Sequence, residues 1–395
     1  MGVTFKTTHR EPLQFGFATA NQIVFGAGTL RNVFADATTW GSRALLVTGS
    51  DPNRSASVRL IAAGLAGLEI VAYSVAKEPT AEIVDAGVRL AKAEACDVII
   101  GCGGGSVIDA GKAVAALLTN GGSVLDYIGS AATKRLSLPS APYIAIPATA
   151  GTGAEVTRNA VISLPQEGMK ISLRSDFMIP KVAIIDPDLA LTLPPSLTAS
   201  TGLDALTQVI EPYVALHPHP IADLFCRDGI QRASKYLRCA YQYGTDLEAR
   251  EEMALVSLYG GMALANGQLG AVHGFASPIG GMFSAPHGAV CGRLLPLVME
   301  CNVRALRKQK AKRTLARYGQ VARWLTGEPQ AEIEDGIEWV KALVAEFRIP
   351  GLSAYGITLA HISEIALKAQ SASSMQGNPI RLTHDELSEI LTLAL

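Results

Sequence analysis

The spacing of hydrophobic positions divides this chain into two halves. In the first half, short runs of β-branched and aliphatic residues alternate with helical segments, such as the stripe formed by Val84, Val88, Ala91 and Ala95. This alternation predicts a parallel sheet with helices packed on its faces. The runs that we predict to be buried strands are Ala44–Thr48, Ile70–Ser74, Val98–Gly101, Tyr143–Ile146 and Lys181–Ile185.

The second half has helical periodicity and no β-branched alternation. The junction, Asp186–Ser196, is short and stiffened by proline, so we expect no flexible linker there. We therefore predict a doubly wound parallel-sheet domain over residues 1–190 and an all-helical bundle over residues 191–395. The expected helices cover 196–216, 221–243, 247–267, 289–318, 330–347 and 358–370.

Composition narrows the class of protein. A chain of 395 residues, 49% hydrophobic and 17% charged, fits a globular protein of two domains with a cleft between them. The 34 basic and 35 acidic side chains form no long run of one sign, so neither nucleic acid nor an anionic membrane is a predicted partner.

Targeting signals and cysteines point to a soluble cytoplasmic protein. The first residues lack the apolar segment of a signal peptide, and no apolar run approaches the ~20 residues that span a bilayer. The six cysteines contain no CxxC pair, and we interpret them as reduced core thiols. They are Cys96, Cys102, Cys226, Cys239, Cys291 and Cys301.

A glycine-rich turn is the strongest local motif. Val98–Lys112 (VIIGCGGGSVIDAGK) runs from a predicted strand through a turn into a helix, for which Ser106 is the predicted N-cap and Asp109 completes a capping box. The exposed N–H groups and dipole of such a helix start suit a pyrophosphate, although an ordinary tight turn without a ligand has the same pattern. The glycines that let the backbone approach a ligand are Gly101, Gly103, Gly104 and Gly105.

Four polar residues in the second half form a candidate metal site. Asp204 and Gln208 are four residues apart, so they lie on one face of a predicted helix, and His273 and His287 come from other segments. Three or four nitrogen and oxygen donors fit a catalytic divalent metal. A satisfied polar contact and a core histidine are the alternative interpretations.

Several motifs together resemble one known family. GGGSVIDAGK resembles the GGGSxxDxxK signature of the iron-containing (group III) alcohol dehydrogenases. The matches continue in the family's order through most of the chain, from about residue 14 to the C-terminus. They include Ile146–Thr157 (IPATAGTGAEVT), Val182–Pro195, Thr201–Glu211 (TGLDALTQVIE), the two-histidine segment Asn266–Gly292, and Asn378-Pro379.

The resemblance implies an NAD(P)-dependent oxidoreductase that transfers a hydride between nicotinamide and a small alcohol or aldehyde. In the family's pattern the metal ligands are Asp, His, His and His, which fall on Asp204, Gln208, His273 and His287. Gln208 departs from it, and an amide is a weaker donor than imidazole for Fe²⁺ or Zn²⁺. We expect altered binding of iron, zinc or another divalent metal, or no metal at all.

The resemblance also implies residues near the cofactor and the reacting atoms. Thr149 and Thr152 correspond to positions that hydrogen-bond the cofactor, while Ala148 replaces a family threonine. Lys170 matches a lysine close to the cofactor, although a lysine on a surface strand is an equal interpretation. Ser277 stands where relatives commonly carry a second histidine, so a hydroxyl or water must relay protons. We predict Lys170 and Ser277 as the catalytic residues.

The choice of nicotinamide cofactor is argued from the end of the second strand motif. NAD-preferring relatives usually place a carboxylate where this chain has Gly49, and a carboxylate repels a 2′-phosphate. Ser50 and Arg54 follow and suit that phosphate, although Asp51 argues against it. We therefore favour NADP over NAD.

Other functions remain alternatives. One is a reductase of a specialised oxo-acid or phosphonate aldehyde, similar to maleylacetate reductase, for which Arg158 and Arg174 are the candidate cations. Another is a cofactor-binding protein that has lost catalysis, because two site positions are changed. A dehydroquinate-synthase-like lyase fits less well, since its metal residues are arranged differently. The resemblance further implies a homo-oligomer such as a homodimer.

Overall fold

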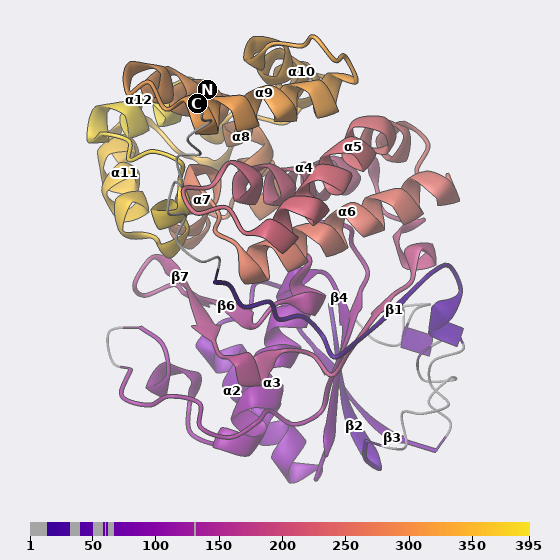
Figure 1. The fold of residues 1–395 in the computed structure, drawn as a ribbon. Coiled ribbons are helices and arrows are strands. Elements are labelled where there is room, and N and C mark those ends of the chain that lie inside the picture. Colours follow the sequence, from indigo (N-terminus) through magenta and orange to yellow (C-terminus); the bar gives the residue numbers. More distant parts are fainter. Residues whose placement is uncertain (1–13, 32–39, 50–57, 60, 62–66, 130–131) are drawn as a thin grey trace, which may run out of the picture.

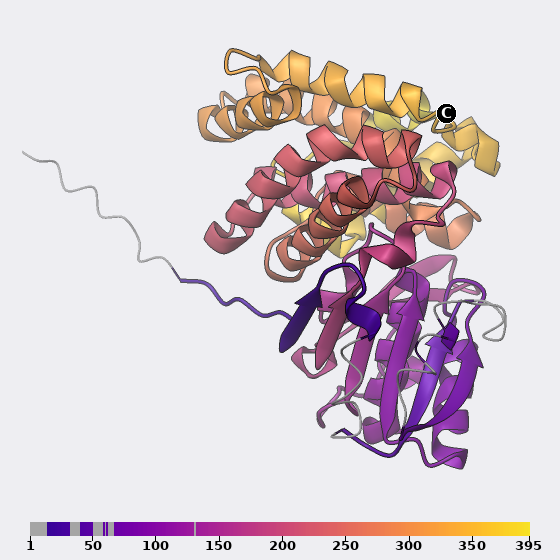
Figure 2. The same cartoon turned by 90° about the vertical axis from the view of Figure 1, so that its right-hand side faces the viewer.

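The computed structural model describes residues 14–31, 40–49, 58–59, 61, 67–129 and 132–395. Figures 1 and 2 show an α/β half and a helical half stacked on it in both views. The first half contains a parallel sheet with the strand order β1-β8-β5-β4-β2-β3 and a separate antiparallel hairpin, β6-β7. The predicted fold class, a parallel α/β sheet followed by helices, is therefore confirmed.

The five predicted strands are present, and three further strands were missed. β1 escaped prediction because it is only four residues long and its residues are exposed or only partly buried. The hairpin escaped because Gln166, Glu167 and Gly168 interrupt its alternation at the turn. The strands are β1 Gln22–Phe25, β2 Arg43–Thr48, β3 Glu69–Ser74, β4 Val98–Gly103, β5 Tyr143–Pro147, β6 Asn159–Leu164, β7 Met169–Arg174 and β8 Val182–Ile185.

Both faces of the sheet are buried, which explains the unbroken apolar runs of its central strands. In β2, Leu45 and Val47 face one core together with α2 (Ala81–Ala93) and α3 (Gly105–Asn120). The intervening residues Ala44 and Leu46 face the opposite core. Successive side chains of a strand point to opposite faces, so each run has to be apolar throughout.

The second half is helical from Pro195 to Ala394. The predicted helix over 289–318 is wrong: the chain breaks at Gln309–Ala311, where Lys310 adopts a left-handed conformation with φ +54°. No glycine or proline marks that break in the sequence. The helices are α4 Pro195–Val214, α5 Pro220–Gln242, α6 Leu247–Asn266, α7 Ala271–Met282, α8 His287–Lys308, α9 Lys312–Thr326, α10 Ile333–Glu346, α11 Ile362–Ser371 and α12 His384–Ala394.

Helix α4 lies at the centre of the helical half. It packs against α5, α6 and α8, and almost every residue from Thr198 to Val214 is buried. Polar side chains on such a helix cost free energy unless they are paired or bind a ligand. Asp204, Gln208 and Glu211 are such side chains. No helix in the described part of the chain has the length and apolarity needed to cross a bilayer.

The two halves touch backbone to backbone at the glycine pair Gly153 and Gly261, and also where Gly281 of α7 lies against Met169 of β7. Gly153, in the loop after β5, has φ +58° and lies against Gly261 of α6. A Cβ atom on either residue would overlap main-chain atoms of the other. Ser257 of α6 reinforces the contact by accepting a hydrogen bond from the Gly153 N–H at 3.2 Å.

We expect Gly261→Ala to lower the free energy of unfolding by about 1–3 kcal/mol, because overpacking must separate the two backbones. Denaturant unfolding measures this change. Gly319→Ala is the matched control, since Gly319 of α9 has only the Arg323 guanidinium near its missing Cβ. That substitution should stabilise the protein by about 0.5–1 kcal/mol through helix propensity. Equal stability of both variants would contradict the close-contact argument.

Candidate functional site

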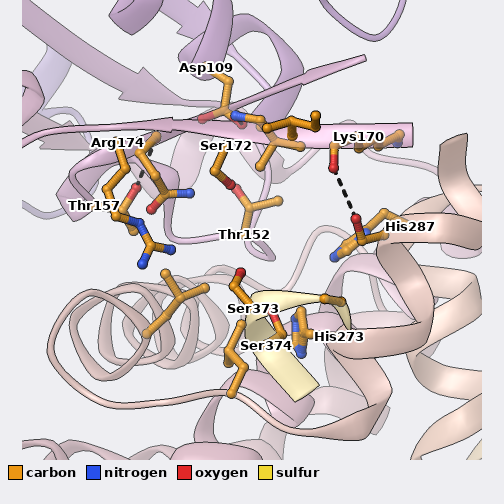
Figure 3. Close-up of a pocket in the computed structure, with 18 of the residues that line it drawn as sticks. Asp109, Thr152, Thr157, Lys170, Ser172, Arg174, His273, His287, Ser373 and Ser374 are labelled. Carbon is orange, nitrogen blue, oxygen red and sulfur yellow. Dashed lines mark hydrogen bonds between the residues drawn. The ribbon is translucent and has the colours of Figure 1, made fainter. Parts of the chain in front are cut away.

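A cleft of about 820 Å³ lies between the two halves. The α/β half contributes the turn before α3 and the β6-β7 hairpin, and the helical half contributes α4, α7 and α8 (Figure 3). This volume falls within the range of pockets that hold small ligands and cofactors. The cleft brings together the predicted residues Gly105, Ser106, Asp109, Thr152, Lys170, Gln208, His273, Ser277 and His287.

The glycine-rich turn differs from the prediction in its capping. The N-cap of α3 is Gly104, so the prediction that Ser106 caps the helix is wrong. Helix α3 begins earlier, at Gly105, because three glycines allow the turn to close without a side-chain cap. Ser106 lies in the first helical turn, where backbone N–H groups have no helical partner and can bind an anion.

Asp109 does not complete a capping box. Its Oδ2 accepts a hydrogen bond from the Val161 N–H of β6 at 3.0 Å. Burial raises the pKa of Asp109 to about 6, against the opposing effects of Lys112 and of this hydrogen bond. The carboxyl therefore fixes the hairpin against α3 and also lines the cleft.

The other predicted cofactor residues lie around this turn. A Cβ atom on Gly105 would lie 2.7 Å from Thr152 Cγ2, so only glycine permits this approach. Thr149 lies against Gly104, yet Thr149, Gly103 and Gly104 are not among the residues that line the cleft. Gly49 follows β2 and lies near Val107 of α3. Ser50 and Arg54 lie outside the described residues.

Lys112 has a structural role that the motif alone does not reveal. Its side chain is fully buried, and Nζ donates to Ala154 O at 2.7 Å, Thr157 Oγ1 at 2.9 Å and Asn159 O at 2.8 Å. Burial lowers the pKa of Lys112 to about 8, although Asp109 and Glu155 oppose the shift. The ammonium thus ties α3 to the loop and strand that form one wall of the cleft.

The three strongest predicted metal ligands converge from three helices. Asp204 Oδ1 of α4 lies 3.6 Å from His273 Nε2 of α7 and 3.6 Å from His287 Nε2 of α8. Within the described residues, Asp204 Oδ1 and His273 Nε2 are buried without a hydrogen-bond partner. A carboxylate and two imidazoles with free donor atoms aimed at one point fit a divalent cation.

Electrostatics in the cluster depend on burial and on the neighbouring charges. Burial opposes the charge of Asp204, but His287 and His273 hold the pKa of its carboxyl below the ordinary value. Burial also lowers the pKa of His287. His273 is the exception, because the neighbouring carboxylates of Asp204 and Glu211 overcome the effect of its burial and raise its pKa to about 9.

Glu211 orients His273, a role that sequence reasoning missed. His273 Nδ1 donates to Glu211 Oε2 at 2.6 Å, and the Val272 N–H donates to Glu211 Oε1 at 2.8 Å. A carboxylate on Nδ1 fixes the imidazole so that the Nε2 lone pair faces the ligand, as in many metal sites. The spacing Asp204, Gln208, Glu211 on one helical face was the available signal.

The Gln208 amide is only partly satisfied. Nε2 donates to Gly151 O at 3.2 Å, while Oε1 is buried and has no partner in the described part of the chain. An amide whose nitrogen is held by a carbonyl leaves its oxygen as the free donor. Gln208 therefore keeps one group that can bind a cation.

Lys170 and Ser277 lie together at the hairpin side of the cleft. Lys170 Nζ is 3.2 Å from Glu78 Oε1, and the Ser277 hydroxyl donates to the Lys170 carbonyl oxygen at 3.0 Å (Figure 3). Both residues line the cleft. Of the two candidate arginines, Arg174 lines it as well, whereas Arg158 pairs with Asp176 at 2.7 Å and does not.

Comparisons with known proteins agree with this arrangement. The family model "Iron-containing alcohol dehydrogenase" matches residues 20–187, and its C-terminal counterpart matches residues 198–395. "Alcohol dehydrogenase 4" of Schizosaccharomyces pombe is 37% identical over 80% of this chain and 73% of its own length. The "NAD-dependent methanol dehydrogenase" of Bacillus methanolicus is 32% identical over 94% of this chain and 97% of its own length.

A solved structure has the same fold over nearly the whole chain. A 1,3-propanediol oxidoreductase superposes with a TM-score of 0.90 at 30% identity, covering 97% of this chain and 100% of that one. The strand order, the helical half and the matched residues thus lead to one assignment. The chain belongs to the iron-containing alcohol dehydrogenase family and is an oxidoreductase that acts on alcohols or aldehydes with a nicotinamide cofactor.

Proposed function

We propose that this enzyme binds the cofactor pyrophosphate at the Gly105–Ser106 turn and a divalent metal at Asp204, Gln208, His273 and His287. The observation that carries the proposal is the convergence of buried donor atoms without partners, Asp204 Oδ1 and His273 Nε2, within the described residues. A bound divalent ion supplies Lewis acidity that polarises a carbonyl oxygen or lowers the pKa of an alcohol. The substrate is a small alcohol or aldehyde.

The residues of the chain provide binding, orientation and proton transfer. Thr152 and the free N–H groups at the start of α3 hold the cofactor, and Lys170 orients it from the hairpin. Asp109 braces that hairpin through Val161. Ser277 offers a hydroxyl beside the cleft for proton transfer in place of an imidazole.

We further propose the division at residue 190 and a cytoplasmic homo-oligomer. The last sheet strand, β8, ends at Ile185, and α4 begins at Pro195, which supports the division. The six cysteines are free thiols, which supports a reducing compartment.

Alanine variants test the metal mechanism. Asp204→Ala and His287→Ala should each lower kcat/KM for aldehyde reduction at least about 100-fold and lower the metal content, because each removes a donor of the cluster. Steady-state kinetics and elemental analysis measure both effects. His217→Ala is the control, since His217 is an exposed histidine outside the cleft. Unchanged turnover in the two cluster variants would remove the metal from the mechanism.

For the cofactor we propose NADP in preference to NAD, because no carboxylate stands at Gly49 to repel a 2′-phosphate. A side chain fits there, since the nearest atom to a Cβ on Gly49 is Val107 Cγ2 at 3.7 Å. Gly49→Asp should reduce kcat/KM for NADPH about tenfold or more and spare NADH, whereas the uncharged Gly49→Asn should have a smaller effect. A wild-type enzyme that already prefers NADH would overturn this choice.

A second candidate function is the reduction of aldehydes that carry an anionic group. Arg174 supports it: the guanidinium lines the cleft (Figure 3), and among the described residues no carboxylate pairs with it. Burial and the nearby Arg158 lower the pKa of Arg174. An anionic group bound beside this partly buried guanidinium would form a charge-assisted hydrogen bond with it.

Arg174→Gln separates the two functions. For an aldehyde with a carboxylate or phosphonate group, KM should rise about tenfold or more, while KM for a neutral aldehyde of similar size should stay unchanged. Arg158→Gln is the control, because Arg158 lies outside the cleft. If Arg174→Gln changes the KM values of both aldehydes equally, Arg174 does not recognise the anionic group of the substrate.

A further inference from the structure

The metal cluster contains a fifth side chain, the thiol of Cys291. The sequence analysis treats it as one of six core thiols, although it lies four residues after the predicted ligand His287. Its Sγ, however, lies within 4.8 Å of the ligand atoms of Asp204, His273 and His287. Those three ligand atoms also lie within 4.8 Å of one another. Building on the function proposed above, we propose that the Cys291 thiolate is a ligand of the same metal.

The local sequence explains how the thiol reaches this place. His287 is the first residue of α8, and Cys291 is four residues further along, so both side chains leave the helix on one face. Cys291 Sγ lies 3.6 Å from His287 Nε2. The cluster therefore draws two donors from α8, in addition to Asp204 from α4 and His273 from α7.

The separations match those of a four-coordinate site. Zinc lies ~2.0–2.1 Å from nitrogen or oxygen and ~2.3 Å from sulfur, so neighbouring ligands of a tetrahedron are about 3.3–3.6 Å apart. Three separations in the cluster are 3.6 Å: His287 to Cys291, Asp204 to His273 and Asp204 to His287.

The Gln208 amide is a poorer fourth ligand for the metal than the Cys291 thiolate. Its nitrogen is held by Gly151 O, and its Cβ and Oε1 lie against Gly260 of α6. A neutral amide is also a weak donor for a transition metal. A thiolate contributes a full negative charge, and with Asp204 it would balance the charge of a divalent ion.

Burial does not argue against this role. Cys291 is fully buried, and burial with the nearby Asp204 charge raises the pKa of the free thiol well above its ordinary value. A bound cation reverses this preference, because a coordinating thiol is deprotonated outright. The softer donor set of one sulfur, two nitrogens and one oxygen should favour zinc or cobalt over magnesium or manganese.

Cobalt provides a direct readout of the thiolate. The purified full chain is stripped with a chelator and titrated with Co²⁺, and the absorption spectrum is recorded. We expect a sulfur-to-cobalt charge-transfer band in the wild type that is absent from Cys291→Ser, with the visible cobalt bands still present. Zinc affinity, measured against a chromophoric chelator, should fall about 10- to 100-fold in Cys291→Ser.

The controls separate this inference from the proposed function. Cys226→Ala removes another fully buried thiol, on α5, and should keep the charge-transfer band. X-ray absorption of the zinc-loaded wild type needs no variant and should show one sulfur at ~2.3 Å. Cobalt binding without the band, or a band that survives in Cys291→Ser, overturns the inference, while activity that depends on Asp204 leaves the oxidoreductase mechanism intact. Failure of the wild type to bind either metal overturns both.

Discussion

Asp204 is 2% exposed, and the groups that face its free oxygen are the imidazoles of His273 and His287. An isolated carboxylate at such a depth costs several kcal/mol or more, so the helices can pack here only if positive charge compensates it. Glu211 is a second buried carboxylate that needs a compensating partner, and it contacts Nδ1 of the same His273 ring. The centre of the helical half therefore combines apolar packing with a buried polar cluster whose charges must be compensated.

Much of the fold could be predicted because a strand that is buried on both faces must be apolar throughout. The central strands β2, β4, β5 and β8 are apolar at almost every position, and this is visible in the residues alone. No comparable sequence signal marks the break between α8 and α9. The helical pattern continues across Lys310, whose left-handed backbone conformation marks the break between the two helices.

The candidate site was predicted less completely than the fold. Asp204, His273 and His287 could be grouped in one hypothesis because all three fall in register with the family pattern, and the structure places their side chains together. The helical spacing places Glu211 on one face with Asp204 and Cys291 on one face with His287, but which way those faces point is decided by the assembled bundle. Ser106 was misassigned for a related reason: three glycines let α3 begin one residue before the first good capping side chain.

The contact between Gly153 and Gly261 also limits how the cleft can open. Because neither residue has a side chain, the two backbones meet there directly, with the Ser257 hydrogen bond beside them. A relative motion of the two halves that kept both this contact and the contact of Gly281 with Met169 would be a rotation about the line that joins them.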